Sequence, residues 1–199
     1  MKNYEVKITL LSPLHLGAGH ADVVTDAEAV RDRYGMPFFP GKRLKGLLYE
    51  SALEMAEISS GKWFTIDDVK KLFAQGNDYE IEVSGIRVDN FYLPQYDKMC
   101  EAWEFLQEKY SGIFSSLDVW ESYSELRAQT AIDNKTHTAA VGSLRNIRAV
   151  EVGTVFEGNI ILLDDNGINR SIVEKAILNL RYAGAKRNRG FGNIRCTVR

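Results

Sequence analysis

The sequence predicts an α+β fold whose elements follow the order strand, helix, strand, strand, helix, strand. Apolar residues alternate with period two near both ends of the chain, and two longer segments repeat them at helical spacing. This is the order of the split βαβ, or ferredoxin-like, fold. The 199 residues and the apolar content of 45% suit one domain with a hydrophobic core and argue against global disorder.

The first half of this order begins with a strand over residues 4–10, where apolar and polar side chains alternate. A helix is expected over residues 42–58, after a proline-flanked segment that cannot continue a strand ladder. Residues 60–80 are ambiguous, although Thr65 could open a short helix within them.

The middle of the chain gives weaker signals. Residues 81–92 indicate a strand in which Gly85 could form a bulge, and residues 97–110 indicate a short helix. Residues 111–148 have no clean period, so we expect an irregular loop or a hairpin there.

The second half begins with a strand or hairpin over residues 150–163. A helix follows. Ser171 and Glu174 have the spacing of a capping box at its start, and Gly184 is of the type that commonly follows the last residue of a helix. A strand over residues 191–198 closes the chain.

The total charge is nearly neutral, since 25 Lys and Arg stand against 27 Asp and Glu. This balance excludes a polycation that binds nucleic acid by bulk charge, but it allows a local basic face. Acidic residues dominate 50–82 and 96–125, whereas basic residues dominate 31–45, 127–148 and 175–199. The basic segments either lie on separate solvated faces or converge on one anionic partner.

The two cysteines, Cys100 and Cys196, stand far apart, so no Cys-x-x-Cys zinc or redox motif is present. We expect both to be reduced, which favours a cytoplasmic location. No apolar run approaches the ~20 residues of a membrane span, and residues 1–11 lack the apolar core of a signal peptide. We therefore expect no membrane partner.

Three cations, Lys42, Arg43 and Lys45, occupy the start of the helix expected over residues 42–58. Cations at this partly positive end of a helix are unfavourable by a few tenths of a kcal/mol each, up to ~1. The arrangement indicates either a phosphate bound by these side chains and by free backbone N–H groups, or three solvated cations.

A second basic segment is the glycine-rich loop 184–192. Its glycines permit close approach of another backbone, Lys186, Arg187 and Arg189 supply positive charge, and Phe191 could stack on a base. No Lys-Ser/Thr pair follows the last glycine, which excludes a Walker loop, and a helix precedes the segment, which excludes a dinucleotide fingerprint. We expect the loop to bind the backbone phosphates of a polymer rather than to serve as a flexible connector.

A third segment, residues 127–142, is polar and basic and has no helical stripe. It predicts a projecting hairpin or arm that includes Arg127 and Thr130. Residue chemistry alone does not distinguish this arm from a generic loop.

Four segments, taken in order, resemble the RAMP superfamily, the repeat-associated proteins of CRISPR systems. Three of them are Ser-Pro-Leu-His-Leu-Gly-Ala-Gly (12–19), Pro-Gly-Lys-Arg-Leu-Lys-Gly (40–46) and Arg-Asn-Arg-Gly-Phe-Gly-Asn (187–193). The fourth, Thr-Ala-Ile-Asp-Asn-Lys-Thr-His-Thr-Ala (130–139), resembles the thumb of the repeated, target-RNA-cleaving backbone subunit of type III effector complexes. Residues 60–125 carry no recognised motif.

The resemblance implies a modified RRM-like palm with a protruding thumb, stacked in copies along a guide RNA. The implied partners are guide RNA, target RNA, other CRISPR effector subunits and copies of the chain itself. The acidic insertion would repel RNA and is expected to face a neighbouring subunit or solvent. The expected RNA contacts are His15, Lys42, Arg43, Lys45, Arg127, Thr130, Lys186, Arg187, Arg189, Gly190 and Phe191.

We accordingly expect one RAMP domain over residues 1–199, made of three parts. The palm is expected to come from 1–59, 80–95 and 149–199, a mostly helical or irregular insertion from about 60–79 and 96–126, and the thumb from about 127–148.

The resemblance also implies catalysis, because in the type III subunit an aspartate in the loop after the first strand cleaves target RNA with a divalent metal. Arg-Asp and then Pro-Gly follow that aspartate, and here Arg31-Asp32 and Pro40-Gly41 follow Asp26. One carboxylate is enough, since RNA supplies its own 2′-hydroxyl and Mg²⁺ accepts one or two carboxylates beside phosphate oxygens and water. We expect Asp26 to be the catalytic residue and the ligand of Mg²⁺. Without the resemblance it would count as a solvated loop residue.

Three functions stay open. The chain is an RNA-guided RNA endonuclease subunit, a binding-only RAMP subunit such as a filament end, or a guide-RNA processing endonuclease that uses His15 or His20 as general acid or base. Asp26 favours the first over the second, and the thumb-like segment favours both over the third. The three histidines are too scattered for a metal site.

Overall fold

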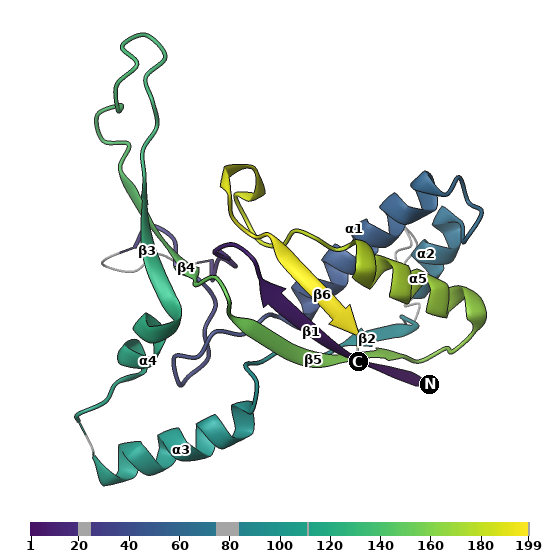
Figure 1. Ribbon diagram of the computed structural model, residues 1–199, viewed down its shortest axis with the longest axis horizontal. Coiled ribbons are helices and arrows are strands. Elements are labelled where there is room, and N and C mark those ends of the chain that lie inside the picture. Colours follow the sequence, from purple (N-terminus) through teal and green to yellow (C-terminus); the bar gives the residue numbers. More distant parts are fainter. Residues whose placement is uncertain (20–24, 75–83, 111, 199) are drawn as a thin grey trace.

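The computed structural model describes residues 1–19, 25–74, 84–110 and 112–198. Its main layer is a four-stranded antiparallel sheet in the order β2-β5-β1-β6 (Figure 1), formed by β1 (Lys2–Leu10), β2 (Ile86–Val88), β5 (Val155–Leu162) and β6 (Ile194–Val198). Helices α1 (Gly41–Ile58) and α5 (Gly167–Asn179) are the two crossover elements. The sequence of these six elements is β1-α1-β2-β5-α5-β6, which confirms the α+β, ferredoxin-like prediction.

Strand β1 is central because its two edges pair with β5 and β6, so that Ile8 lies opposite both Phe156 and Cys196. Its alternating apolar side chains are buried, as expected from the sequence: Tyr4, Val6, Ile8 and Leu10. The polar side chains between them lie on the opposite face of the sheet.

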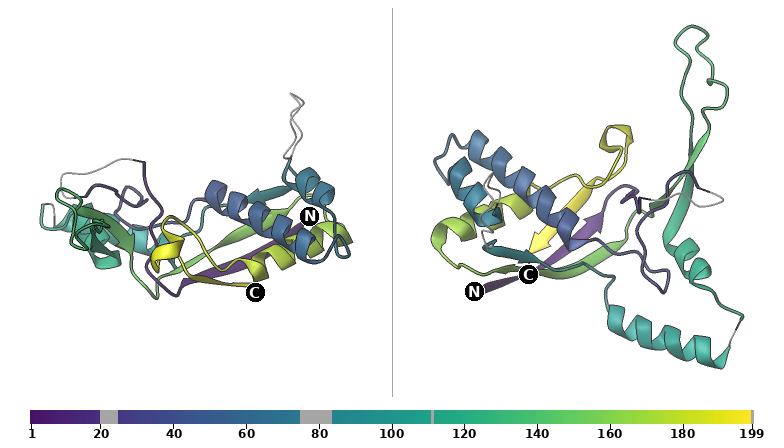
Figure 2. Two further views of the ribbon diagram at one scale, coloured as in Figure 1. Left: turned by 90° about the horizontal axis from the view of Figure 1, so that it is seen from above. Right: turned by 180° about the vertical axis from the view of Figure 1, so that it is seen from behind.

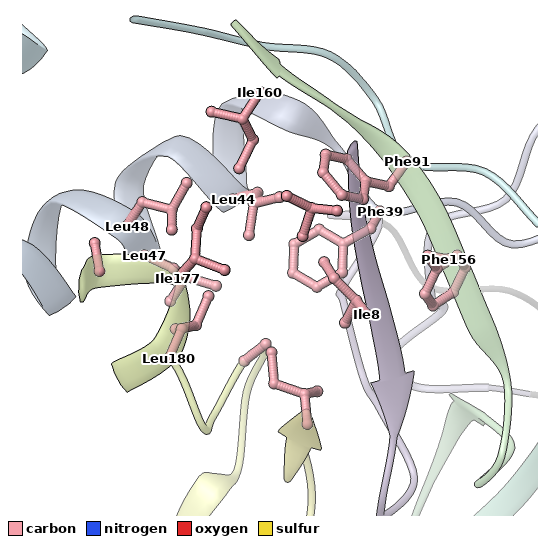
Figure 3. Packing of buried hydrophobic residues seen from close by; sticks show 14 of the residues in the cluster. Ile8, Phe39, Leu44, Leu47, Leu48, Phe91, Phe156, Ile160, Ile177 and Leu180 are labelled. Atoms are coloured by element: carbon pink, nitrogen blue, oxygen red, sulfur yellow. The ribbon is translucent and has the colours of Figure 1, made fainter. Parts of the chain in front are cut away.

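The core lies between the sheet and the two crossover helices (Figure 3). Leucines of α1 and isoleucines of α5 face aromatic and aliphatic side chains of the strands. The contact between helices includes a hydrogen bond from Ser51 Oγ to the carbonyl oxygen of Ala176 (2.9 Å). Gly158 of β5 makes room for the ring of Phe91, because a Cβ at this glycine would lie 2.6 Å from a ring carbon.

The residues between β2 and β5 form structure outside the main sheet (Figures 1 and 2). They comprise α3 (Tyr96–Lys109), α4 (Ser116–Tyr123) and a hairpin of β3 (Ser124–Gln129) and β4 (Arg145–Val150). We name residues 124–150 the thumb hairpin. It extends away from the sheet, which confirms the expected hairpin within this part of the chain.

Two short helices begin at capping boxes. The Thr65 hydroxyl accepts from the N–H of Asp68 and Asp68 accepts from the N–H of Thr65 at the start of α2 (Ile66–Phe73). The same pair of contacts between Ser115 and Asp118 starts α4, in a region where the sequence predicted irregular structure. The loop or hairpin expected at residues 116–123 was therefore wrong, although a helix there fits the mostly helical or irregular insertion expected over about 96–126. Capping and the burial of Trp120 stabilise a helix too short to show a period.

Strand β2 and helix α5 have other boundaries than expected. Strand β2 covers only three residues, because the chain then leaves the ladder and Phe91 pairs with Phe39. Gly85 precedes this strand, and residues 81–83 lie outside the described part. The cap expected at Ser171 and Glu174 was wrong, since Asn166 accepts from the N–H of Asn169 and starts α5 one turn earlier.

None of the described helices is long and apolar enough to span a membrane.

Candidate nucleic-acid interface

Three segments that are distant in sequence meet at the foot of the thumb hairpin. Leu14 and Val150 exchange two backbone hydrogen bonds (2.9 and 2.8 Å), which joins the loop after β1 to β4. The N–H of Arg148 donates to the carbonyl oxygen of Ala27 (3.1 Å), which joins the segment after residue 24 to the same strand. The glycine-rich loop 184–192 is the third segment.

His15 connects two of these segments with the thumb hairpin. Its Nδ1 lies 2.7 Å from the carbonyl oxygen of Arg148, and since a carbonyl only accepts, Nδ1 carries the proton. Its own carbonyl oxygen accepts from the N–H of Ala185 (3.0 Å). The side chain is 5% exposed, so His15 primarily orders the junction, and the RNA contact expected for it stays a prediction.

Two glycines allow the loop 184–192 to pack closely. Gly184 has φ +73°, and a Cβ there would lie 2.6 Å from the carbonyl oxygen of His15. Gly192 has φ +74°, and its Cβ would lie 1.9 Å from the carbonyl oxygen of Ala183. Gly190, with φ +81°, has open space around it, which leaves its backbone accessible to a ligand.

The cations of this loop lie beside the foot of the thumb hairpin. Lys186 Nζ donates to Gln129 Oε1 at the end of β3 (2.5 Å). Partial burial, together with the positive charges of Arg189 and Arg145, lowers the pKa of Lys186. Arg189 is exposed. Positive charges from the loop, Lys186 and Arg189, therefore lie close to Arg145 of the thumb strand β4, and together they could bind an anion.

Phe191 packs inward instead of facing solvent. It is 7% exposed and forms a small apolar cluster with Ile147 and Ala149 of β4, against which Ala27 packs. In this position the ring stabilises the junction, and stacking on a base, which stays a prediction, would require it to leave the cluster.

The three cations at the start of α1 point in different directions. An Arg43 Nη donates to the carbonyl oxygen of Gly17 (2.5 Å), toward the junction. Lys45 Nζ donates to Ser84 Oγ beside β2 (2.7 Å), and burial lowers its pKa. Lys42 is exposed. The structure thus brings Arg43 to the junction and separates Lys45 from it.

A cleft of about 410 Å³ lies where α1, the loop after β1 and the glycine-rich loop face one another. Its lining residues come mostly from the segments 12–19, 40–46 and 184–192, and the sequence had suggested only that basic segments of the chain could converge on one anion. Arg187 and Glu50, which lie 4.0 Å apart, both line it, so the cleft is basic but not purely cationic. Its lining consists of His15, Leu16, Gly17, Arg43, Gly46, Leu47, Glu50, Gly184, Ala185 and Arg187.

Asp26 lies beside strand β4 and is exposed. Its N–H donates to the carbonyl oxygen of Asn146 (2.9 Å), and its Oδ2 accepts from the N–H of Asn146 (2.7 Å). The carboxylate is therefore fixed near the start of the thumb strand β4, and it stays accessible to solvent.

The two described acids that follow Asp26 in sequence, Glu28 and Asp32, have other partners. Asp32 accepts from two backbone N–H groups and from the hydroxyl of Tyr96 (2.6 Å), and Glu28 is buried. Asp22 lies outside the described residues. Within the described residues no group of three metal-ligating side chains exists. Asp26 alone therefore fits a hard cation only where RNA phosphates and water complete the ligands.

The thumb hairpin carries polar contacts at its foot and exposed apolar side chains along its length. Arg127 pairs with Glu125 on β3 (2.6 Å), and Thr130 is exposed where the strand ends. Large exposed apolar side chains follow the hairpin: Leu126 (45%), Ile132 (58%), Val141 (105%) and Leu144 (63%).

Sequence reasoning missed the residues that join the thumb hairpin to the palm. Gln129, Arg145 and Asn146 lie in the segment expected to form the projecting thumb, but their roles depend on contacts with distant loops. Glu28 and Arg148 carry no motif either. Only the alternation of apolar side chains at 147 and 149 could have indicated strand β4.

Comparison with known proteins gives one family and a few relatives. The family model described as the RAMP superfamily matches residues 7–195. Among curated proteins, the CRISPR system Cms endoribonuclease Csm3 of Methanocaldococcus jannaschii is 23% identical over 206 residues, covering 94% of this chain and 75% of the relative.

Solved structures resemble the whole chain. A chain from the cryo-EM structure of the Type III-B Cmr-beta bound to cognate target RNA matches with a TM-score of 0.73 and 15% identity, covering 100% of this chain and 97% of the other. A chain from the apo state matches with a TM-score of 0.69 and 15% identity, covering 98% and 96%. At these identities the likeness shows a common fold.

Proposed function

The chain belongs to the RAMP superfamily, and from this membership we propose that it is a backbone subunit of a type III CRISPR effector complex that binds guide RNA. The relative named an endoribonuclease and the structural match bound to target RNA support the proposal. In this proposal the chain has a palm, an insertion and a thumb with the boundaries expected from its sequence.

The observation that carries the proposal is the cleft between α1 and the two loops. Arg43 and Arg187 line it, and Lys186 and Arg189 continue the positive charge toward the thumb hairpin. Guanidinium and ammonium groups on a track of this kind bind a phosphate backbone irrespective of sequence. The guide RNA would pass over the glycine-rich loop at Gly190, where the backbone is open.

Cleavage of the complementary target RNA is the second part of the proposal. Asp26 would act at the foot of the thumb hairpin, where guide–target duplex and protein meet. The 2′-hydroxyl of the target would lose its proton to water and attack the adjacent phosphate. A 2′,3′-cyclic phosphate would form as the bond to the 5′-oxygen of the next nucleotide breaks, and that oxygen would take a proton from water. The chain therefore needs to position the backbone rather than supply a nucleophile. A bound Mg²⁺ would stabilise the charge that develops on the phosphate, and Asp26 would hold it together with RNA oxygens and water.

The test is incubation of the assembled complex with labelled matched RNA and Mg²⁺. A ladder of regularly spaced products that requires the divalent ion would support cleavage by this subunit. Intact RNA under conditions of saturating binding would contradict cleavage and leave the binding function.

The binding-only alternative also has support. Asp26 already accepts a hydrogen bond from Asn146, and it belongs to no group of three metal-ligating side chains among the described residues. An aspartate can hold the thumb hairpin without chemistry. For the processing alternative, His15 gives little support, because it is buried and its Nδ1 is engaged. The other histidine of that alternative, His20, lies outside the described residues.

The surface formed by α3 and α4 is proposed to face a neighbouring protein subunit. Of the residues of α3, only Trp103 is buried, and exposed apolar side chains stand among acidic ones. Acidic surface repels RNA, so a basic protein surface with apolar patches is the partner that fits. The exposed apolar residues are Phe105, Tyr110, Ile113, Phe114 and Leu117.

A further inference from the structure

A buried ion pair joins the Asp26 loop to the thumb hairpin. Glu28, two residues after Asp26, is 3% exposed. Its carboxylate accepts from Thr25 Oγ1 (3.1 Å) and from Trp120 Nε1 (3.0 Å). The Nε of Arg148, on strand β4, lies 3.8 Å from Glu28 Oε2. A carboxylate from the loop, an indole from α4 and a guanidinium from the thumb strand thus share one buried site.

Glu28 is the buried countercharge of Arg148. The Arg148 side chain is 7% exposed, and its Nε has no hydrogen-bond partner within the described residues. Its other nitrogens reach Ser124 Oγ at 3.4 Å and Glu121 at 4.0 Å, but the side chain of Glu121 is 57% exposed. A buried guanidinium that loses its countercharge is strongly disfavoured, so the pair constrains both segments that carry it.

The loop and β4 run side by side over three consecutive steps. Asp26 pairs with Asn146, Ala27 with residues 147 and 148, and Glu28 with Arg148. The first step is exposed, and water can compete for its hydrogen bonds. The contact between Glu28 and Arg148 is buried, so it fixes the register between the loop and β4, and the exposed contact between Asp26 and Asn146 follows that register.

We infer that Glu28 is a positioning residue that ties the Asp26 loop to the thumb hairpin, so that the seating of the hairpin sets the position of the Asp26 carboxylate. This inference rests on the proposed function for its consequence in cleavage. The mechanical link itself rests on the contacts of Glu28 and Arg148. A hairpin displaced by a poorly fitting guide–target duplex would carry Asp26 with it, and cleavage would report the fit.

The variant Glu28→Gln tests the link. It keeps an oxygen that accepts from the Trp120 N–H and removes the charge that faces Arg148. The matched control is Glu121→Gln, which also contacts Arg148 but from the solvent side and without touching the Asp26 loop.

The first measurement is amide hydrogen exchange on the isolated chain, which needs no cleavage. The amides of Asp26, Asn146 and Arg148 should exchange at least about tenfold faster in Glu28→Gln, and at the wild-type rate in Glu121→Gln. Unchanged exchange in a folded Glu28→Gln chain would overturn the inference. Should Glu28→Gln not fold, Trp120→Phe replaces it, because it removes one hydrogen-bond donor to the same carboxylate. Its amide exchange is then compared with that of Glu121→Gln.

The second measurement is single-turnover cleavage in the assembled complex. Glu28→Gln should slow cleavage roughly tenfold or more and raise the Mg²⁺ concentration for half-maximal rate, with target binding unchanged. A variant that merely contains less folded protein would give less product at an unchanged Mg²⁺ concentration for half-maximal rate. Such a result would count against a positioning role of Glu28. A wild-type complex that does not cleave would refute the proposed catalysis, while the exchange result would still decide the link.

Discussion

Asp26 and Asn146 are 120 residues apart in sequence and exchange two hydrogen bonds, one from each backbone N–H. One acceptor is the carbonyl oxygen of Asn146, and the other is the Asp26 carboxylate itself. An amide oxygen can replace that carboxylate oxygen, because it accepts a hydrogen bond in the same position. The contact and the charge can therefore be separated by one substitution.

The substitution Asp26→Asn should abolish target cleavage and leave guide and target binding equal to wild type or slightly stronger. The amide keeps the contact with Asn146 but binds Mg²⁺ far more weakly because it carries no charge, and one negative charge near the RNA backbone is removed. Cleavage of labelled RNA and binding by titration should be measured on the same complex. Cleavage should also disappear without divalent ion and with a 2′-deoxy nucleotide at the scissile position.

Asp67→Asn is the matched control, since Asp67 is an exposed acid in the first turn of α2, away from the thumb hairpin. It should cleave as wild type does. An Asp26→Asn complex that cleaves at the wild-type rate would make the aspartate a bystander and favour the binding-only function.

The main sheet could be predicted because its signals are local. Strand β1 alternates strictly, and the stripe of α1 repeats at helical spacing, so each element is visible without its neighbours. Helix α4 and the bounds of the short strand β2 could not be found that way. Their boundaries depend on Trp120, which is fully buried, and on the pairing of Phe91 with Phe39.

The candidate site was predictable in its charges but not in its geometry. The motifs pointed to Arg43, Lys45 and the glycine-rich loop, but nothing in the sequence separates Arg43, which faces Gly17, from Lys45, which faces Ser84. The inward packing of Phe191 likewise depends on Ile147, a residue of the distant strand β4. Such contacts are set by tertiary structure and leave no local pattern.

Arg43 and Lys45 should differ in their effect on RNA binding. Arg43→Ala should weaken guide binding at all sequences alike and lower the slope of log affinity against log salt by about 0.7. Lys45→Ala should have the smaller effect, because its ammonium group faces Ser84 and burial lowers its pKa. Binding titrations at several salt concentrations check both variants. An unchanged slope in the double variant would refute an anion site at the start of α1.

Arg189→Glu should lose guide binding while the fold remains intact. The side chain is exposed, and reversing its charge places a carboxylate beside Lys186 on the proposed phosphate track. Lys62→Glu, an equal change of charge at an exposed residue after α1, is the control and should bind normally. Circular dichroism and thermal unfolding verify the fold of both. Normal guide binding by Arg189→Glu would make the loop a connector.

The surface of α3 and α4 should be needed for assembly but not for folding. The double variant Phe105→Glu and Ile113→Glu changes side chains that are 58% and 67% exposed, so the isolated chain should unfold at the wild-type temperature. Placed against a neighbouring protein, two added charges would be costly to desolvate. Light scattering on the reconstituted complex should show a smaller assembly. Leu178→Glu, at a residue 70% exposed on α5, is the control, and equal assembly by both variants would contradict the proposed interface.

Gly192 should be far less tolerant of substitution than Gly190, although both have positive φ. Alanine at either position adopts a left-handed backbone conformation, which costs about 1–2 kcal/mol. At Gly190 that is the whole cost, because nothing lies within 4 Å of the added Cβ. At Gly192 the Cβ would meet the carbonyl oxygen of Ala183 at 1.9 Å, so the backbone must also shift.

We therefore expect Gly190→Ala to lower the free energy of unfolding by about 1–2 kcal/mol and Gly192→Ala by at least about 3 kcal/mol. Urea unfolding measures both values on the isolated chain. The N–H of Gly192 donates to the carbonyl oxygen of Pro13 (2.8 Å), so the shift should also loosen the loop after β1. Equal losses in the two variants would mean that the loop adapts to the added carbon, and that its close packing against Ala183 does not stabilise the junction.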